Sequence, residues 1–146
     1  MASGQTVHDA ISQCAYTSCA PALVMLGLEK AIMEGQDVNM RLGDRQLTAL
    51  HRVIDCFDPS LPLVQLLVQN KADLNATDVE GETALMSAAF MQEPTCVALL
   101  LGARADPKMR DAEGDTALDW SRVQRWRRGA TTNTECRQLL EQAIDI

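Results

Sequence analysis

The clearest pattern in this sequence is an apolar stripe at helical spacing. Val97, Leu100 and Leu101 stand at i, i+3 and i+4, so they lie on one face of a predicted helix. Pro94 is well placed to begin this helix, because the first turn does not need the N–H that proline lacks. Just before it, residues 84–90 predict a shorter helix whose small alanines let the second helix come close.

One phrase of residues occurs twice in the chain, 33 positions apart. Residues 78–85 read DVEGETAL and residues 111–118 read DAEGDTAL. Within the first copy, Gly81 suits a tight turn with positive φ. Thr83 is placed as an N-cap, whose hydroxyl accepts a hydrogen bond from a free backbone N–H of the first helical turn. Self-similarity at a fixed period predicts an array of stacked helix-turn-helix units.

An earlier unit repeats this pattern less regularly. Thr48 is predicted to begin its first helix, and Val64 and Leu67 belong to the apolar stripe of its second helix. Thr48 lies two residues too far from the next unit for the period, and the extra residues fit best in the connection 55–62. At the turn position Gln46 replaces glycine, which predicts a distorted hairpin.

The two end units depart further, as expected of units that must show one face to water. A helix over residues 7–15 is predicted to cap the N-terminus, with Pro21 opening its partner helix. In the last unit the first helix is predicted to continue through Trp126 and to stop at the glycine that follows. Thr132 and Glu135 then predict a capping box for the last helix.

The repeated phrase resembles the ankyrin-repeat family, whose pattern is similar to D-x-x-G-x-T-P-L-H-x-A followed by a leucine-rich helix and G-A-D-x-N. Alanine takes the place of the family proline at residues 49, 84 and 117. His51 keeps the family histidine, which implies a structural role in bonding backbone between repeats. Lys71 and Arg104 stand where the family often has glycine, so a positive φ is expected at both residues.

This resemblance implies an all-α ankyrin-repeat solenoid of about four helix-turn-helix units with hairpin loops, forming a single domain over residues 1–146. We expect a degenerate N-terminal capping unit at residues 1–40. Two repeats follow at residues 41–76 and 77–109, and an elongated C-terminal capping unit occupies residues 110–146.

Arrays of this kind mostly bind other macromolecules. The resemblance therefore implies a non-catalytic protein–protein interaction module, such as an adaptor, an inhibitor or an assembly factor. Its protein partner would lie on the concave face formed by the hairpins and first helices, and a partner with a basic segment fits the acidic residues there. We expect a monomer. Two alternatives stay open: a structural or self-associating array, and the recognition domain of a larger enzyme.

Carried over residue by residue, the variable positions of the family mark one candidate partner-binding surface. It consists of Asp44, Arg45, Leu47, Asp55, Val79, Glu80, Glu82, Phe90, Met91, Ala112, Glu113, Asp115 and Val123. Its carboxylates either solubilise exposed hairpins or form a docking strip whose charges select a basic partner. Phe90 is the main candidate for a buried anchor, with packing against Met91 or the neighbouring unit as the alternative.

A second candidate surface is the stretch 119–128, which holds four arginines and both tryptophans. Its candidate contacts are Trp120, Arg122, Arg125 and Trp126. Arginine and tryptophan are enriched at binding hot spots. Arginine at a helix C-terminus also complements the helix dipole, and one tryptophan must help cover the last core. The stretch therefore either caps the array or contacts an acidic peptide or a phosphate.

Composition and charge narrow the function further. The formal net charge of −7 disfavours nucleic acid and anionic membranes as partners. No apolar run reaches the roughly 20 residues of a membrane helix, and no signal peptide pattern is present, so we expect a soluble protein of the cytoplasm, the nucleus or both. With His8 and His51 as the only histidines and no phosphate-binding loop, we expect neither catalysis nor a cofactor.

The cysteines and one asparagine are candidates for metal binding or covalent modification. The five cysteines contain no C-x-x-C pair and are expected to be reduced thiols, mostly packed as small apolar groups. A zinc site from Cys14, Cys19 and His8 is the alternative, although it lacks a known ligand spacing. The family resemblance also implies Asn75 as a candidate for asparaginyl hydroxylation, since Leu67 stands eight residues before it.

Overall fold

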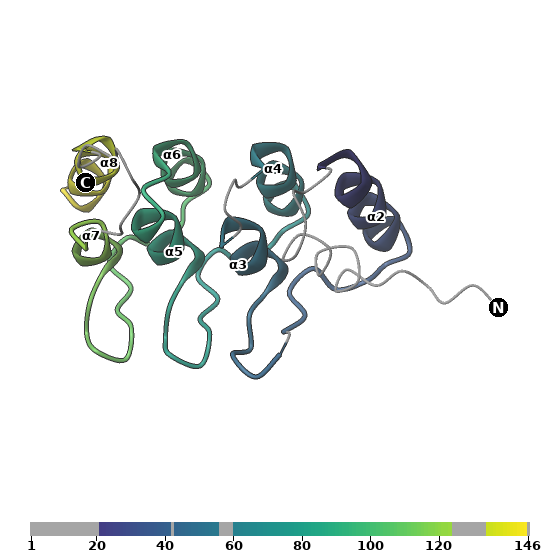
Figure 1. Cartoon of the computed structure of the whole chain (residues 1–146), viewed down its shortest axis with the longest axis horizontal. Helices are drawn as coiled ribbons and strands as arrows, with labels where there is room; N and C mark the ends of the chain where they lie inside the picture. Colours follow the sequence, from purple (N-terminus) through teal and green to yellow (C-terminus); the bar gives the residue numbers. More distant parts are fainter. Residues whose placement is uncertain (1–20, 42, 56–59, 124–133, 146) are drawn as a thin grey trace. The chain divides into compact units, whose positions relative to one another are not determined.

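The computed structural model describes residues 21–41, 43–55, 60–123 and 134–145. Within those ranges the chain forms seven α-helices and no strand (Figure 1). None of these helices combines the length and the apolar character that a bilayer crossing requires. The predicted all-α architecture is thus confirmed.

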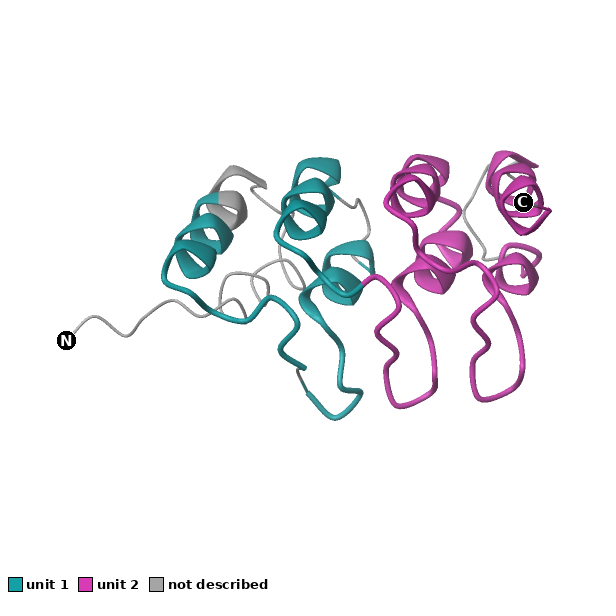
Figure 2. Ribbon diagram, turned by 180° about the vertical axis from the view of Figure 1, so that it is seen from behind, with its two compact units in different colours: residues 1–73 teal, residues 74–146 magenta. Residues whose placement is uncertain are grey.

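The chain divides into two compact units, residues 1–73 (unit 1) and residues 74–146 (unit 2) (Figure 2). Unit 1 contains α2 (Pro21–Met33), α3 (Ala49–Ile54) and α4 (Leu61–Gln69). Helix α4 packs against both α2 and α3. The largest side chains in this aliphatic core are Leu28, Leu50, Ile54, Leu63 and Leu67. Helix α3 directly follows Thr48, as predicted.

Unit 2 contains two helix pairs arranged in two layers. Its helices are α5 (Ala84–Phe90), α6 (Pro94–Gly102), α7 (Ala117–Trp120) and α8 (Thr134–Ile144). Helices α5 and α7 pack side by side, and each also packs against the second helix of its own pair, α6 or α8. Helix α5 has the predicted bounds and α6 begins at the predicted proline. The core is filled mainly by Leu85, Met86, Leu100 and Leu140.

Each first helix begins at a threonine that forms a reciprocal capping box. The capping threonines are Thr48, Thr83 and Thr116. Each hydroxyl accepts the N–H of the third helical residue, whose side chain in turn accepts the threonine N–H. These accepting residues are His51, Met86 and Asp119. The predicted N-cap role of Thr83 is therefore confirmed, and Thr48 begins its helix in the same way.

Several turns place a non-glycine residue in the left-handed region. Lys71 has a φ of 62° and Arg104 a φ of 73°, as the comparison with the family pattern predicted. Gln46 has a φ of 56° and occupies the turn position that glycine takes in unit 2. Its backbone N–H and its side-chain amide both donate to the carbonyl of Gly43. A residue other than glycine pays a conformational cost at each of these positions.

An asparagine side chain joins successive loops within each unit. The Oδ1 atom of Asn39 accepts the backbone N–H of Asp73 at 2.7 Å in unit 1. In unit 2 the Oδ1 atom of Asn75 accepts the N–H of Asp106 at 2.8 Å. The same side chain thus performs the same structural task in both units, and hydroxylation of Asn75 stays a prediction.

The first helix of the C-terminal repeat, residues 110–146, was predicted to continue through Trp126. This prediction is wrong, because α7 ends at Trp120. The Ser121 hydroxyl donates to the Leu118 carbonyl at 2.6 Å, and the Gln92 side chain donates to the Ser121 carbonyl at 2.9 Å. Both carbonyls would have to accept backbone N–H groups if the helix continued. The backbone N–H groups of the two residues after Ser121 instead donate to the carbonyls three residues before them. These shorter bonds tighten and end the helix.

Some predictions fall outside the described residues. These are the helix over residues 7–15, the zinc alternative formed by His8, Cys14 and Cys19, and the N-cap at Thr132. Arg125 and Trp126 of the second candidate surface also lie there.

Candidate functional site

Two hairpin turns of unit 2 carry most of the predicted partner-binding residues. At the base of each turn an aspartate accepts two backbone N–H groups through one carboxylate oxygen. Asp78 accepts from Glu80 and Glu82, both at 2.9 Å. Asp111 does the same with the residues at 113 and 115, at 3.0 and 2.8 Å. Glycines at 81 and 114, with φ of 79° and 90°, complete the turns.

This geometry leaves the variable positions of unit 2 at the surface. Val79 is 59% exposed. Glu80, Ala112, Glu113 and Asp115 are also exposed, and Glu82 is half-buried. The bonds to Asp78 and Asp111 that close these turns are donated by backbone N–H groups. Substitution of the exposed side chains therefore does not remove them.

The two turns of unit 2 are joined to each other. The N–H of Ala112 donates to the carbonyl of Glu80 at 2.9 Å. Beside this bond, a Cβ atom at Gly81 would lie 3.0 Å from the Ala112 nitrogen and 3.1 Å from the Cα of Asp111. The absence of a side chain at Gly81 therefore permits the close approach that forms the bond.

An aromatic pair lies next to these hairpins. Phe90, the last residue of α5, and Trp120, the last residue of α7, make an edge-to-face contact with ring centroids 5.4 Å apart and an interplanar angle of 80°. Both residues are half-buried. Met91 is only 6% exposed, so its side chain is not available to a partner, which corrects its assignment to the binding surface. Trp120 belongs to the neighbouring repeat, so the predicted alternative that Phe90 packs against the neighbouring unit is confirmed, and the structure identifies the residue involved.

The indole N–H of Trp120 donates to the second carboxylate oxygen of Asp111 at 2.7 Å. Burial raises the pKa of Asp111, but the hydrogen bonds from Trp120 and from backbone N–H groups outweigh it, so the pKa falls below its ordinary value of 3.8. One carboxylate therefore ties the hairpin to α7 and fixes the orientation of the indole ring. The sequence indicated that this aspartate matters because it recurs in both copies of the repeated phrase, 33 residues apart.

Just after Trp120 the second candidate surface begins. Asp119 bonds to both the backbone N–H and the hydroxyl of Thr116, and these bonds lower the pKa of Asp119. Its other oxygen pairs with Arg122 at 3.4 Å. Val123 is 50% exposed. The described part of this stretch thus presents an arginine and a valine at the surface of unit 2.

The candidate residues of unit 1 are divided between surface and core. Asp44 and Arg45 are exposed in the turn, and Asp55 is exposed at the C-cap of α3. Leu47 is only 8% exposed and belongs to the core. Its side chain is therefore not available to a partner in the folded chain, which corrects its assignment to the binding surface.

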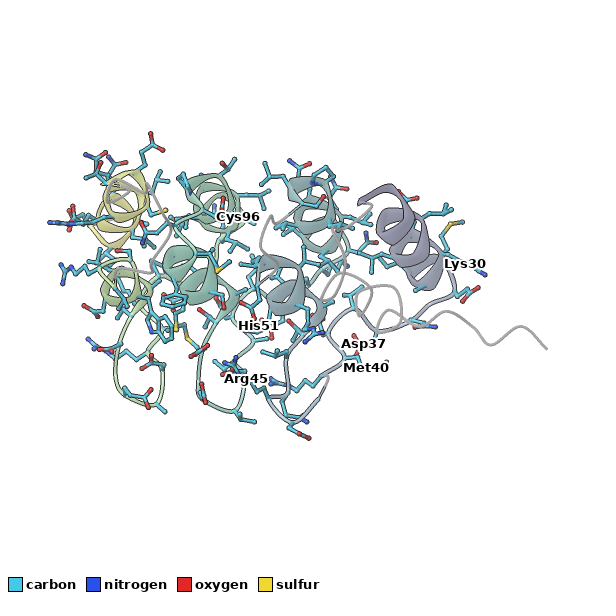
Figure 3. All side chains as sticks on the ribbon, viewed as in Figure 1. Lys30, Asp37, Met40, Arg45, His51 and Cys96 are labelled. Carbon is cyan, nitrogen blue, oxygen red and sulfur yellow. The ribbon has the colours of Figure 1, made fainter. Side chains whose placement is uncertain are left out.

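His51 has a structural position. It is buried in α3 (Figure 3) and its Nδ1 atom lies 2.8 Å from the Thr48 hydroxyl and 3.3 Å from the Thr48 nitrogen. These bonds within its own repeat give His51 a structural role, while the predicted bonding of backbone between repeats stays a prediction. A buried imidazole that accepts a capping N–H is poorly placed to act as a general base on a substrate.

Two cysteines of unit 2 are described, and both are buried. Burial raises the pKa of the Cys96 and Cys136 thiols to about 11, with a smaller contribution from the nearby Glu93 carboxylate. Neither thiol is in a disulfide. For these two residues the prediction of free thiols packed as small apolar groups is confirmed. Thiols of this kind are poor nucleophiles and poor metal ligands.

Three carboxylates of the first hairpin lie close together. Asp78, Glu80 and Glu82 bring one oxygen each within 4.8 Å of one another. One oxygen of Asp78 already accepts the two backbone N–H groups of the turn. These carboxylates give the hairpin a negative surface, and the aspartate is accounted for by its structural role.

A family model described as ankyrin repeats in three copies matches this chain twice, over residues 7–111 and over residues 50–145. The two matches together span nearly the whole sequence, including the capped first helices, the apolar second helices and the hairpins described above. Ankyrin repeats are generally protein–protein interaction modules. The chain belongs to the ankyrin-repeat family.

Proposed function

We propose that this chain is a non-catalytic module that binds a protein partner through the hairpins and first helices of unit 2. Such a module would act as an adaptor, an inhibitor or an assembly factor in the cytoplasm or the nucleus. The proposed surface comprises Val79, Glu80, Glu82, Ala112, Glu113 and Asp115 on the hairpins, and Phe90, Trp120, Arg122 and Val123 on and after the first helices.

The observation that carries this proposal is a pair of matching hairpins with a fixed backbone and exposed variable side chains. Their turns are closed by Asp78 and Asp111 and joined by the bond from Ala112 to Glu80. A preorganised backbone lowers the entropy that a partner must remove on binding. Exposed side chains on such a backbone can determine partner choice without disturbing the fold.

The side chains supply both kinds of contact that an interface needs. Val79 and the half-buried aromatic pair offer apolar surface, which provides most of the affinity in known interfaces. The surrounding carboxylates offer charge, which mainly raises the association rate and selects the partner.

Site-specific photocrosslinking would test this proposal. A photoreactive amino acid would replace Val79 or Ala112 in the full chain, and cell extract would be irradiated with each purified protein. We expect the same partner to crosslink from both hairpin positions, because they lie on adjacent hairpins 33 residues apart.

Matched controls would carry the photoreactive group on second helices. Gln65 on α4 and Gln138 on α8 are exposed and lie on second helices rather than on hairpins, so they carry the same chemistry outside the proposed surface. A partner that crosslinks from the control positions and not from the hairpins would contradict the proposal. Circular dichroism of each variant would establish that the helices are retained.

A further inference from the structure

The indole of Trp120 is held in one orientation at the edge of the hairpin surface. Its N–H donates to Asp111 at 2.7 Å, and its ring meets Phe90 edge-to-face. Both contacts restrain the ring, yet Trp120 remains only half-buried. A ring that is already fixed in this way can be contacted by a partner with little further loss of side-chain entropy.

Among the residues that the structure describes in this part of unit 2, the charges are unbalanced. Residues 110–123 contain the carboxylates of Asp111, Glu113, Asp115 and Asp119 and the guanidinium groups of Arg110 and Arg122, which is four negative charges against two positive ones. Both arginines have local tasks, because Arg110 donates to the Gly114 carbonyl at 2.6 Å and Arg122 pairs with Asp119.

Glu113 and Asp115 carry the excess negative charge at the surface. Both side chains are exposed, and the structure gives neither carboxylate a side-chain partner among the described residues. Their backbone N–H groups bond to Asp111, and that carboxylate also accepts the Trp120 indole. The two exposed carboxylates therefore belong to the same hydrogen-bonded turn as the fixed ring.

Building on the proposed function, we propose that the partner is a basic peptide segment that places an arginine against Trp120, beside Glu113 and Asp115. A guanidinium group is planar, stacks on aromatic faces and donates in pairs to carboxylates. An ammonium group carries the same charge, but it cannot stack as a plane or donate through a rigid fork. The site should therefore prefer arginine to lysine at equal charge.

A peptide titration would test the proposal on the full chain. Trp126→Phe would be present in every protein, so that Trp120 is the only tryptophan. Hexa-arginine and hexa-lysine would be added in turn while the Trp120 indole N–H signal is followed by NMR. We expect hexa-arginine to shift this signal and to bind at least threefold more tightly than hexa-lysine.

The carboxylates would be tested with a charge-matched control. Glu113→Gln with Asp115→Asn should weaken hexa-arginine binding at least fivefold, and the turn should persist because these two residues bond to Asp111 through their backbone N–H groups. The control pair Glu135→Gln with Asp145→Asn removes the same two charges from exposed positions in and after α8. We expect it to weaken binding less than twofold.

Equal weakening by both pairs, equal affinity for the two peptides, or an unmoved indole signal would each overturn the proposal. These outcomes leave the proposed function separately testable. A hairpin crosslink to a native partner combined with failure of the peptide test would reject the arginine site while retaining the binding surface.

Discussion

The two units of this chain close equivalent turns with different chemical groups. In unit 2 a carboxylate closes each turn, from Asp78 and from Asp111. At the aligned position unit 1 has Gly43, and the turn is closed by the backbone and side-chain amides of Gln46. The backbone motif thus tolerates either solution. Only the carboxylate, however, introduces a charge and a group that titrates.

The same contrast holds at the helix caps. The group that accepts the threonine N–H is the imidazole of His51 in unit 1. In unit 2 it is the thioether of Met86 in one repeat and the carboxylate of Asp119 in the next. The distances are 3.3, 3.4 and 3.0 Å in that order. The shortest bond is the one to the charged acceptor, so the last repeat caps its helix with a carboxylate where the two preceding repeats use an imidazole and a thioether.

Among substitutions that test the difference between the two units, Asp111→Ala is expected to change the free energy of unfolding most. The substitution removes the acceptor of two backbone N–H groups and of the Trp120 indole. Each donor left without an acceptor costs roughly 1–3 kcal/mol. Since these donors are partly buried, we expect the free energy of unfolding to fall by about 2–4 kcal/mol, measured by urea denaturation.

The control for this variant is Asp145→Ala, which removes a carboxylate from an exposed position near the C-terminus. We expect it to change the free energy of unfolding by about 0.5 kcal/mol or less. A loss at Asp111 no larger than this would show that the carboxylate is not needed to hold the turn.

A second large effect concerns the buried thiols, which report on unit 2 alone. In a chain with Cys14, Cys19 and Cys56 replaced by serine, only Cys96 and Cys136 remain. Because both thiols are buried and have raised pKa values, we expect alkylation at pH 8 to be at least about 30-fold slower than in urea-unfolded chain.

The same variant tests whether residues 1–146 behave as the single domain that we predicted. Protection of the thiols measures the opening of unit 2, while circular dichroism measures the helices of the whole chain. Coincident denaturation curves are expected for one cooperative array. Earlier loss of the helical signal, with the thiols still protected, would show that unit 1 unfolds by itself.

A smaller effect is expected from acid. The pKa values of Asp111 and Asp119 are depressed in the folded state, so their stabilisation is fully present above the unfolded-state pKa. It is lost as the pH falls from about 4 through the lower folded-state values. Asp111→Asn with Asp119→Asn should therefore flatten the dependence of the unfolding free energy on pH in this range.

The informative comparison for the acid experiment is the difference between the variant and the wild type at each pH. We expect this difference to be largest near neutrality and to shrink as the pH approaches 2. A difference that stays constant from pH 6 to pH 2 would contradict a stabilising role for the ionised carboxylates.

The smallest effects are expected at a position that the two units share. Lys71 and Arg104 stand 33 residues apart and both have positive φ. Replacing either by glycine should raise the free energy of unfolding by roughly 0.5–1 kcal/mol, because glycine adopts this region without the steric cost that other residues bear. Equal gains would show that this turn contributes alike in both units.

Lys108→Gly provides the reference for these glycine variants. Lys108 is exposed in a turn and is not among the residues with positive φ. Glycine there adds flexibility to the unfolded chain without relieving strain, so a small loss of stability is expected. A gain at this position as large as that at Lys71 would refute the steric explanation.

Local signals and the repeat explain why much of the fold could be predicted from the sequence. Thr83 and Pro94 mark helix starts through their own chemistry, and the structure begins α5 and α6 accordingly. The positive φ at Lys71 and Arg104 could be predicted because both align with a glycine of the family pattern. In each case the information lay in one residue or in its place in the repeat.

What could not be predicted depends on side chains that meet across repeats. Just after the end of α7, Gln92 bonds to Ser121 from 29 residues away. The contact of Phe90 with Trp120 likewise has no local signal, since the residue that aligns with Trp120 in the preceding repeat is the small Ser87. The partner-binding surface stays a prediction, because its residues follow from variable positions rather than from chemistry within the chain.

The missing side chain at Gly81 limits how freely repeats could be exchanged in protein engineering. A Cβ atom there would lie 3.0 Å from the backbone nitrogen of the following hairpin. The unit 1 turn carries Gln46 at the equivalent position. Transplanted in front of hairpin 111–116, that turn would require the two backbones to move apart by a few tenths of an ångström and would strain the bond from Ala112. These repeats are therefore not interchangeable, because each hairpin fits the repeat that follows it in the chain.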